Sequence, residues 1–172
     1  MNRLIHQWKK TIALTEQDIT LPNGKTIIHT TIEHPGAAVI IPITQEKRVI
    51  MVNQYRPSVK AWTIEVPAGT MELGEDPLTC TQRELEEETG YSADTFQSLG
   101  QLIPMAGMCN EKQHLYIATG LHLTQRLECD DDEIIEVQTY SLQELETMIA
   151  NGEISDSKTV ACLYKAKLAG YL

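Results

Sequence analysis

Hydrophobic and polar positions along the chain predict mostly short strands, with helices confined to three segments. The stretch Ile12–Glu33 predicts an N-terminal antiparallel hairpin, because Pro22-Asn23-Gly24 interrupts it and Asn-Gly is a strong hairpin turn. Ala37–Thr44 is a continuous apolar run, which indicates a strand covered on both faces. The other predicted strands are Val49–Arg56, Thr63–Val66, Phe96–Ile103, His114–Thr119 and Ile134–Tyr140.

Residues that favour the starts and ends of helices mark the limits of the predicted helices. Asp76 is a good N-cap, Pro77 suits the first helical position, and Gly90 suits the position after the end, so a helix is predicted over Pro77–Thr89. Strands mixed with a few helices indicate the α/β class, with a sheet sandwiched between helices. Two later helices are predicted, from the capping box Ser141-Leu-Gln-Glu144 to Ala150 and over Ser157–Leu168.

The length and composition fit one soluble domain. The chain has 172 residues, of which 42% are apolar and 22% charged. We therefore expect a single domain over residues 1–172 whose core needs no disulfide or structural metal. The N-terminal ten residues lack the apolar centre of a signal peptide, and the run AAVIIPI is too short to span a bilayer. We therefore expect a cytoplasmic protein. Its four cysteines form no CxxC pair and are expected to be reduced thiols in or near the core.

The net charge is −10, which argues against a nucleic acid or an anionic membrane as partner. The charge is uneven, because residues 61–172 carry six Lys and Arg against twenty Asp and Glu. An acidic half of this kind either is a solvated surface or holds a cation.

One face of the first helix concentrates this charge. Glu84, Glu87 and Glu88 converge because positions three and four apart share a helix face, whereas Glu86 points away. Converging carboxylates can be a solvated acidic face or ligands of a hard divalent ion such as Mg²⁺.

The rest of the helix bears on that choice. Arg83 is its only cation, and we expect the three carboxylates to have no cationic partner. Leu78 and Leu85 are seven residues apart, which predicts an apolar stripe that anchors the helix to the sheet.

The spacing of these residues resembles a known motif, the Nudix box. The match is Gly69-x5-Glu75-x7-Arg83-Glu84-Leu85-x-Glu87-Glu88-x-Gly90-Tyr91, with nine defined positions over 23 residues. The resemblance implies the Nudix fold, a mixed β-sheet between α-helices, preceded here by the N-terminal hairpin. It also implies a hydrolase of nucleoside diphosphates linked to another group, dependent on Mg²⁺ or Mn²⁺.

Roles for the box residues follow from the resemblance. Glu84 and Glu88 would be the main metal ligands, with Glu87 sharing or bridging, and the carbonyl oxygen of Ala68 is a further expected ligand. Gly69 would let the backbone turn close to the site. The two other charged positions would support the site rather than touch substrate: Arg83 would orient the carboxylates, and Glu75 would be structural.

Stretches outside the box resemble the branch that hydrolyses ADP-ribose and other nucleoside diphosphate sugars. They are Gln54-Tyr55-Arg56, Ile64–Gly69, Gly107–Glu111, Asp132–Val137 and Gly152–Thr159. The resemblance favours ADP-ribose, which would give AMP and ribose 5-phosphate. However, Ala106 stands where this branch usually has a proline, so GDP-mannose and other nucleotide sugars stay open.

Four residues outside the box have expected roles. The resemblance makes Glu111 the general base or the residue that positions the attacking water; otherwise Glu87 or Glu88 would be the base. Arg56 is the expected phosphate or sugar contact, since its planar fork suits phosphate oxygens, although it could form a surface ion pair. Glu65 would bind sugar or base or support the metal ligands, and Gly107 would line the substrate site.

The nucleotide base would stack on a flat aromatic side chain. Trp8, Tyr55 and Trp62 are the candidates, although each could be a core or interface residue instead. In this branch the N-terminal strands of a second subunit often help to hold the base. We therefore expect a homodimer formed through residues 1–35, with the catalytic core in residues 36–172.

Two other interpretations of the function stay open. A housekeeping hydrolase of oxidised nucleotides fits the flanking stretches less well. A non-catalytic ADP-ribose sensor is disfavoured by the intact box. His29, His34 and His114 are expected to be structural or surface residues, and Asp130–Glu133 a solvated turn.

Overall fold

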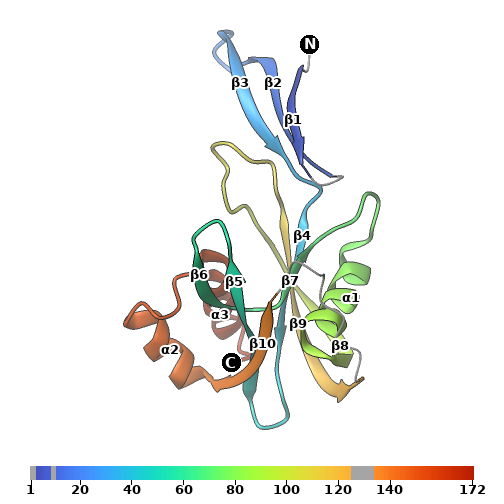
Figure 1. Cartoon of the computed structure of the whole chain (residues 1–172), viewed down its shortest axis with the longest axis vertical. Helices are drawn as coiled ribbons and strands as arrows, with labels where there is room; N and C mark the ends of the chain where they lie inside the picture. Colours follow the sequence, from blue (N-terminus) through green and yellow to red (C-terminus); the bar gives the residue numbers. More distant parts are fainter. Residues whose placement is uncertain (1–2, 9–10, 125–133) are drawn as a thin grey trace.

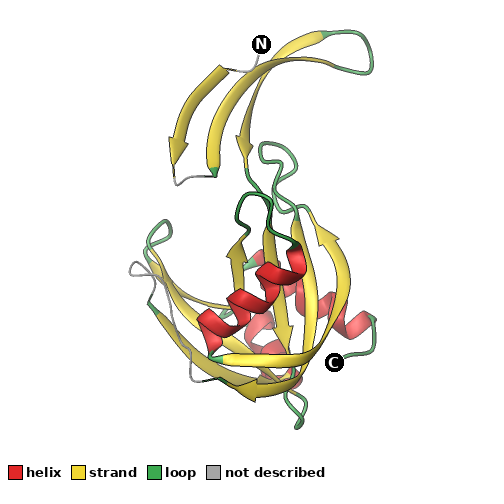
Figure 2. Ribbon diagram, turned by 90° about the vertical axis from the view of Figure 1, so that its right-hand side faces the viewer, coloured by secondary structure: helices red, strands yellow, loops and turns green. Residues whose placement is uncertain are grey.

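The structure, a computed structural model, describes residues 3–8, 11–124 and 134–172. Within these ranges ten strands form three sheets, accompanied by three helices. One sheet, built from the N-terminal strands, projects from one end of the molecule, whereas the other two sheets and the helices pack into one body (Figures 1 and 2).

The projecting sheet contains β1 (Arg3–Trp8), β2 (Ile12–Thr20) and β3 (Thr26–Glu33), all antiparallel. The predicted hairpin is confirmed, because β2 and β3 pair along their length and the turn between them contains Gly24 at φ 83°. The additional strand β1 is exposed throughout. It was not predicted, since its sequence RLIHQW lacks the alternation that marks a half-buried strand.

The central sheet has the order β7-β4-β9-β8. Its strands are β4 (Ala37–Pro42), β7 (Ala68–Thr70), β8 (Tyr91–Leu102) and β9 (Gln113–Leu123). β4 pairs in parallel with β9 and antiparallel with β7, which confirms the predicted mixed sheet. All six residues of β4 are buried, as its apolar run indicated.

The remaining strands form a separate antiparallel sheet. In it β5 (Arg48–Arg56) lies between β6 (Ala61–Glu65) and β10 (Ile135–Ser141). The predicted strands therefore exist, but they are divided between two sheets rather than joined in one.

The helix predictions are confirmed. α1 (Pro77–Thr89) begins after Asp76, whose carboxylate accepts hydrogen bonds from the second and third helical N–H groups, and it ends at Gly90 with φ 71°. α2 (Leu142–Ala150) has the complete capping box at its start, and α3 (Ser157–Leu168) is capped by Asp156.

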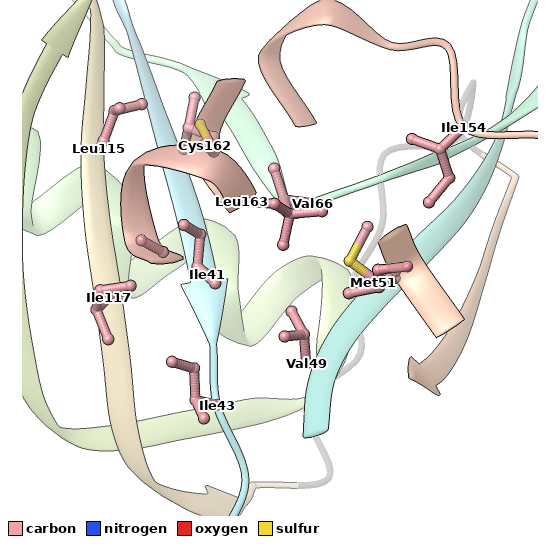
Figure 3. Packing of buried hydrophobic residues seen from close by; sticks show 13 residues of the cluster. Ile41, Ile43, Val49, Met51, Val66, Leu115, Ile117, Ile154, Cys162 and Leu163 are labelled. Atoms are coloured by element: carbon pink, nitrogen blue, oxygen red, sulfur yellow. The ribbon is translucent and has the colours of Figure 1, made fainter. Parts of the chain in front are cut away.

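Helices cover both faces of β4, as the sandwich prediction required. Val39 and Ile41 pack in one cluster with Leu163 of α3, whereas Ile40 on the opposite face packs with Leu85 of α1. Figure 3 shows Ile41 of β4 and Leu163 of α3 among the buried side chains of the first cluster. Complete burial of a leucine such as Leu85 contributes about 1.5–3 kcal/mol.

The predicted stripe of Leu78 and Leu85 is wrong in part, because the Leu78 side chain is exposed. The helix instead buries Cys80 and Leu85, together with parts of its polar face. The cysteines within the described residues, Cys80, Cys109 and Cys162, are free and buried as expected, and Cys129 lies outside those residues. Burial raises the pKa of the Cys80 and Cys162 thiols to about 12.

Candidate active site

Arg83 is the centre of the charged face of α1. Its Nε and Nη2 donate to the two carboxylate oxygens of Glu75, at 3.1 and 3.2 Å. Its Nη1 donates to Glu84 Oε1 at 2.7 Å and to Glu87 Oε2 at 2.8 Å. The expectation that the carboxylates lack a cationic partner is therefore wrong, because the sequence does not reveal that the guanidinium folds back over its own helix.

These contacts shift the pKa values of Arg83 and Glu75. Burial would lower the pKa of Arg83, but the hydrogen bond to Glu75, the charge of Glu84 and the hydrogen bond to Glu87 outweigh it and raise that pKa. The hydrogen bond from Arg83 lowers the pKa of Glu75. One guanidinium thus faces three carboxylates, of Glu75 just before the helix and of Glu84 and Glu87 on it, and Glu88 is a further glutamate of the helix.

The backbone of β7 receives two of these carboxylates. A Cβ atom on Gly69 would lie 1.8 Å from the carboxyl carbon of Glu84, so only glycine allows that side chain to reach this position. Glu88 Oε2 accepts a hydrogen bond of 2.9 Å from the N–H of Ala68. Both glutamates are buried, at 8% and 3% exposure, so the helix and β7 hold acidic groups where water does not solvate them fully.

The chemistry of this site fits a hard divalent cation. The described residues include no three His, Cys, Asp or Glu side chains already arranged around a metal position. One reason is that Glu84 and Glu87 each direct an oxygen to Arg83. The carboxylates of α1, with Glu84 seated against Gly69, are nevertheless suited to a hard divalent cation, which prefers carboxylate oxygens.

A second charged group lies on the antiparallel sheet. Glu65 is 2% exposed and accepts two hydrogen bonds from Arg56, Nε to Oε1 at 2.8 Å and Nη2 to Oε2 at 2.6 Å. Lys158 of α3 also donates to Glu65, and it donates to Asp156 at 3.1 Å. Thr63 completes the group with a bond of 2.5 Å to Glu65.

Burial alone would raise the pKa of Glu65, but hydrogen bonds from Arg56 and Lys158 and the lysine charge lower it to about 2. Lys158 was not among the expected site residues, although it lies in one of the stretches that mark the branch. Its link to Glu65 joins residues 93 apart in the chain, and no local pattern reveals such a contact.

Glu111 lies in a third place, in the loop between β8 and β9, where Gln113 Nε2 donates to its Oε1 at 3.1 Å. The loop and the N-terminal sheet enclose a cleft of about 450 Å³, lined by Glu111 and Ala106 from the loop and by His29 and Thr31 from β3. Gly107 is in the same loop, and a Cβ there would meet nothing within 4 Å. Its expected part in substrate binding stays a prediction.

Two of the candidate aromatic side chains lie on the antiparallel sheet. Tyr55 and Trp62 pair across β5 and β6, with ring centroids 5.9 Å apart, and they point to the face opposite Arg56 and Glu65 because successive side chains of a strand alternate between faces. Trp8 stacks on His6 in the exposed sheet instead. His34 Nδ1 accepts a hydrogen bond from the N–H of Gly36, a structural role as expected. The stretch Asp130–Glu133 lies outside the described residues.

Comparison with known proteins agrees with this geometry. Residues 33–162 match the NUDIX domain family. The chain is 38% identical to a methanol dehydrogenase activator of Bacillus methanolicus and 35% identical to an ADP-ribose pyrophosphatase of Bacillus subtilis, over 92% of this chain and 86% of each relative. It is 32% identical to a GDP-mannose pyrophosphatase of Yersinia enterocolitica, over 80% of this chain and 75% of that protein.

The fold is shared with a solved structure as well. The crystal structure of an ADP compounds hydrolase aligns with a TM-score of 0.81 at 19% identity, over 100% of this chain and 95% of that one. The chain belongs to the Nudix family and is a Nudix hydrolase. No helix in the described ranges has the length and apolar character needed to cross a membrane.

Proposed function

We propose that this chain hydrolyses the pyrophosphate bond of a nucleoside diphosphate sugar, with ADP-ribose as the first candidate and Mg²⁺ or Mn²⁺ as cofactor. The observation that carries the proposal is the set of acidic side chains that α1 holds against the backbone of β7. The similarity to an ADP-ribose pyrophosphatase over most of both chains supports the choice of substrate.

Glu84, Glu87, Glu88 and the carbonyl oxygen of Ala68 would hold the metal. When bound, Mg²⁺ or Mn²⁺ neutralises charge on the pyrophosphate oxygens and favours ionisation of water. Arg83 would orient Glu84 and Glu87 through the two hydrogen bonds of its Nη1.

Arg56 would bind a phosphate of the substrate. Two of its guanidinium nitrogens are fixed on Glu65, so the Nη1 edge would face the phosphate. Glu65 holds this edge in one orientation, and it stays ionised at neutral pH because its pKa is about 2. Preorganised donors of this kind favour the transition state because they need no rearrangement during the reaction.

Glu111 would act as general base. A water oxygen attacks one phosphorus of the pyrophosphate, the bond from that phosphorus to the bridging oxygen breaks, and the water proton passes to the Glu111 carboxylate. With ADP-ribose, the products are AMP and ribose 5-phosphate. Glu87 or Glu88 would be the base if Glu111 only binds substrate.

The N-terminal sheet would pair with that of a second copy to form a homodimer. Its exposed apolar side chains, Leu4 at 57% and Ile28 at 69% exposure, favour burial in an interface. A cytoplasmic location and the absence of a nucleic-acid partner stay predictions from the sequence.

A substrate panel tests the proposal. ADP-ribose, ADP-glucose, UDP-glucose, GDP-mannose, NADH, a diadenosine polyphosphate and an oxidised dNTP would be incubated with Mg²⁺, and phosphate released by a coupled phosphatase would be measured. The highest kcat/KM for ADP-ribose would support the proposal and show that Ala106 is compatible with that substrate. A preference for GDP-mannose would support the alternative, and binding of ADP-ribose without release of AMP would indicate a sensor.

A further inference from the structure

The end of β3 and the loop that carries Glu111 lie side by side although they are far apart in the sequence (Figure 1). Ile32 N–H donates to the carbonyl of Met108 at 2.7 Å, and the N–H of Asn110 donates to the carbonyl of Ile32 at 3.2 Å. The loop is thereby paired in parallel with the end of β3 at Ile32.

The same two segments continue into the central sheet, but with a change of register. Ile32 pairs with Cys109, and the β4–β9 ladder begins where Ala37 pairs with Gln113. Between these two pairs the segment from β3 to β4 contains four residues, 33–36, whereas the segment from the loop to β9 contains three, 110–112. Gly36 lies in the longer segment at φ 110°, in the left-handed region that favours glycine. Glu111 lies in the shorter segment, directly opposite this irregularity.

The Asn110 side chain fixes the register at this point. Its Oδ1 accepts a hydrogen bond of 2.8 Å from the N–H of His34, and its Nδ2 donates to the carboxylate of Glu33. The other oxygen of Glu33 accepts from the hydroxyl of Thr15 on β2 at 3.1 Å. A continuous series of hydrogen bonds therefore runs from β2 through β3 to the residue that immediately precedes Glu111.

We propose that Asn110 is a positioning residue, which couples the N-terminal sheet to the Glu111 carboxylate. The inference rests on the proposed role of Glu111 as general base. The backbone of Asn110 is bonded to Ile32 and its side chain to Glu33 and His34, so a shift of the sheet against the core moves the next residue as well. Packing of a second copy on the sheet would then change turnover without contact with α1.

A set of variants measured with Mg²⁺ and the preferred substrate of the panel tests the coupling. Asn110→Ala should lower kcat about tenfold with little change in KM, because misplacement of a catalytic group by about 1 Å costs one to two orders of magnitude in rate. In a Glu111→Gln background the same substitution should have no further effect, since Asn110 acts only through that carboxylate.

Exchange of the amide and the carboxylate between positions 110 and 33 gives a second readout. Asn110→Asp places a carboxylate against Glu33 and should lower kcat at least as much as Asn110→Ala. Adding Glu33→Gln restores a donor and an acceptor at the two positions and should recover most of the lost kcat. Asn53→Ala is the matched control, because Asn53 also donates to a glutamate, Glu136, but on the β5–β10 pair.

The outcomes separate the two proposals. If Glu111→Gln has a low kcat and Asn110→Ala has the kcat of the wild type, the proposed coupling through Asn110 is wrong and the role of Glu111 stands. Equal losses from Asn110→Ala in both backgrounds, or no recovery with Glu33→Gln, would also overturn it. If Glu111→Gln itself is fully active, Glu111 is not the base and the coupling fails with it. A wild-type chain that hydrolyses nothing in the panel contradicts the proposed function as a whole.

Discussion

The carboxyl group of Glu84 occupies the space where a side chain on Gly69 would begin, 1.8 Å from the position of a Cβ. The first residue of the box and its central glutamate are thus required by the same close contact. This contact explains in physical terms why glycine stands 15 positions before that glutamate.

Gly69→Ala should therefore be destabilising and inactive, because the new methyl group displaces Glu84. We expect a loss of about 1–3 kcal/mol in the free energy of unfolding, as for other overpacked sites. Chemical denaturation measures it. In a Glu84→Ala background the same substitution should cost much less, because the clashing carboxyl group is gone; an equal cost in both backgrounds would show that another contact is responsible.

Arg83→Lys should lower kcat by about 10- to 100-fold, as loss of a residue that orients metal ligands commonly does. A lysine keeps the charge but cannot donate to Glu75, Glu84 and Glu87 with a planar fork. Steady-state kinetics at saturating Mg²⁺ measures the loss. Wild-type activity of this variant would mean that charge alone is sufficient.

Acid should weaken the fold through Glu65. Its pKa is 4.5 ordinarily and about 2 in the folded chain, so the folded state binds its proton less readily than the unfolded state. Its contribution is complete above about pH 4.5 and is lost as the pH falls towards 2, and it amounts to roughly 3 kcal/mol.

Thermal unfolding of the wild type and Glu65→Gln from about pH 6 to about pH 2.5 checks this prediction. At about pH 6 the Glu65→Gln variant should be less stable than the wild type, because Arg56 and Lys158 lose a charged partner. The difference in melting temperature should narrow as the pH falls. Glu46→Gln, at an exposed turn, controls for loss of one carboxylate. A difference that does not depend on pH would contradict the assignment.

Glu111→Gln should lower kcat with little change in KM, since the amide keeps the shape but cannot accept the proton of water. Lys112→Ala, the exposed neighbour, is the control in the same loop. A large rise in KM with unchanged kcat would make Glu111 a substrate-binding residue instead.

The sequence predicted the local structure well where a local cause acts. The Asp76 and Ser141 caps and the Asn23-Gly24 turn were identified because each satisfies backbone groups within a few residues. The fully apolar β4 was recognised because burial on both faces leaves a continuous run.

The contacts that complete the site could not be predicted in this way. The Lys158–Glu65 bond and the backbone hydrogen bond from Ile32 to Met108 join residues that the fold alone brings together. Arg83 was expected to orient the carboxylates, but its sharing among three of them depends on a rotamer that the sequence does not specify.

The most direct test of the account compares AMP release from ADP-ribose, with Mg²⁺, by the wild type, Glu88→Gln and Glu86→Gln. Glu88 is buried against β7, whereas Glu86 lies two residues earlier on the same helix, outside the contacts described for the site. We predict that Glu88→Gln loses more than ~100-fold in kcat/KM, since metal-dependent stabilisation of charge is worth several kcal/mol, while Glu86→Gln stays within about twofold of the wild type. Near-wild-type turnover by a folded Glu88→Gln variant would contradict the claim that these carboxylates form a metal-dependent hydrolytic site.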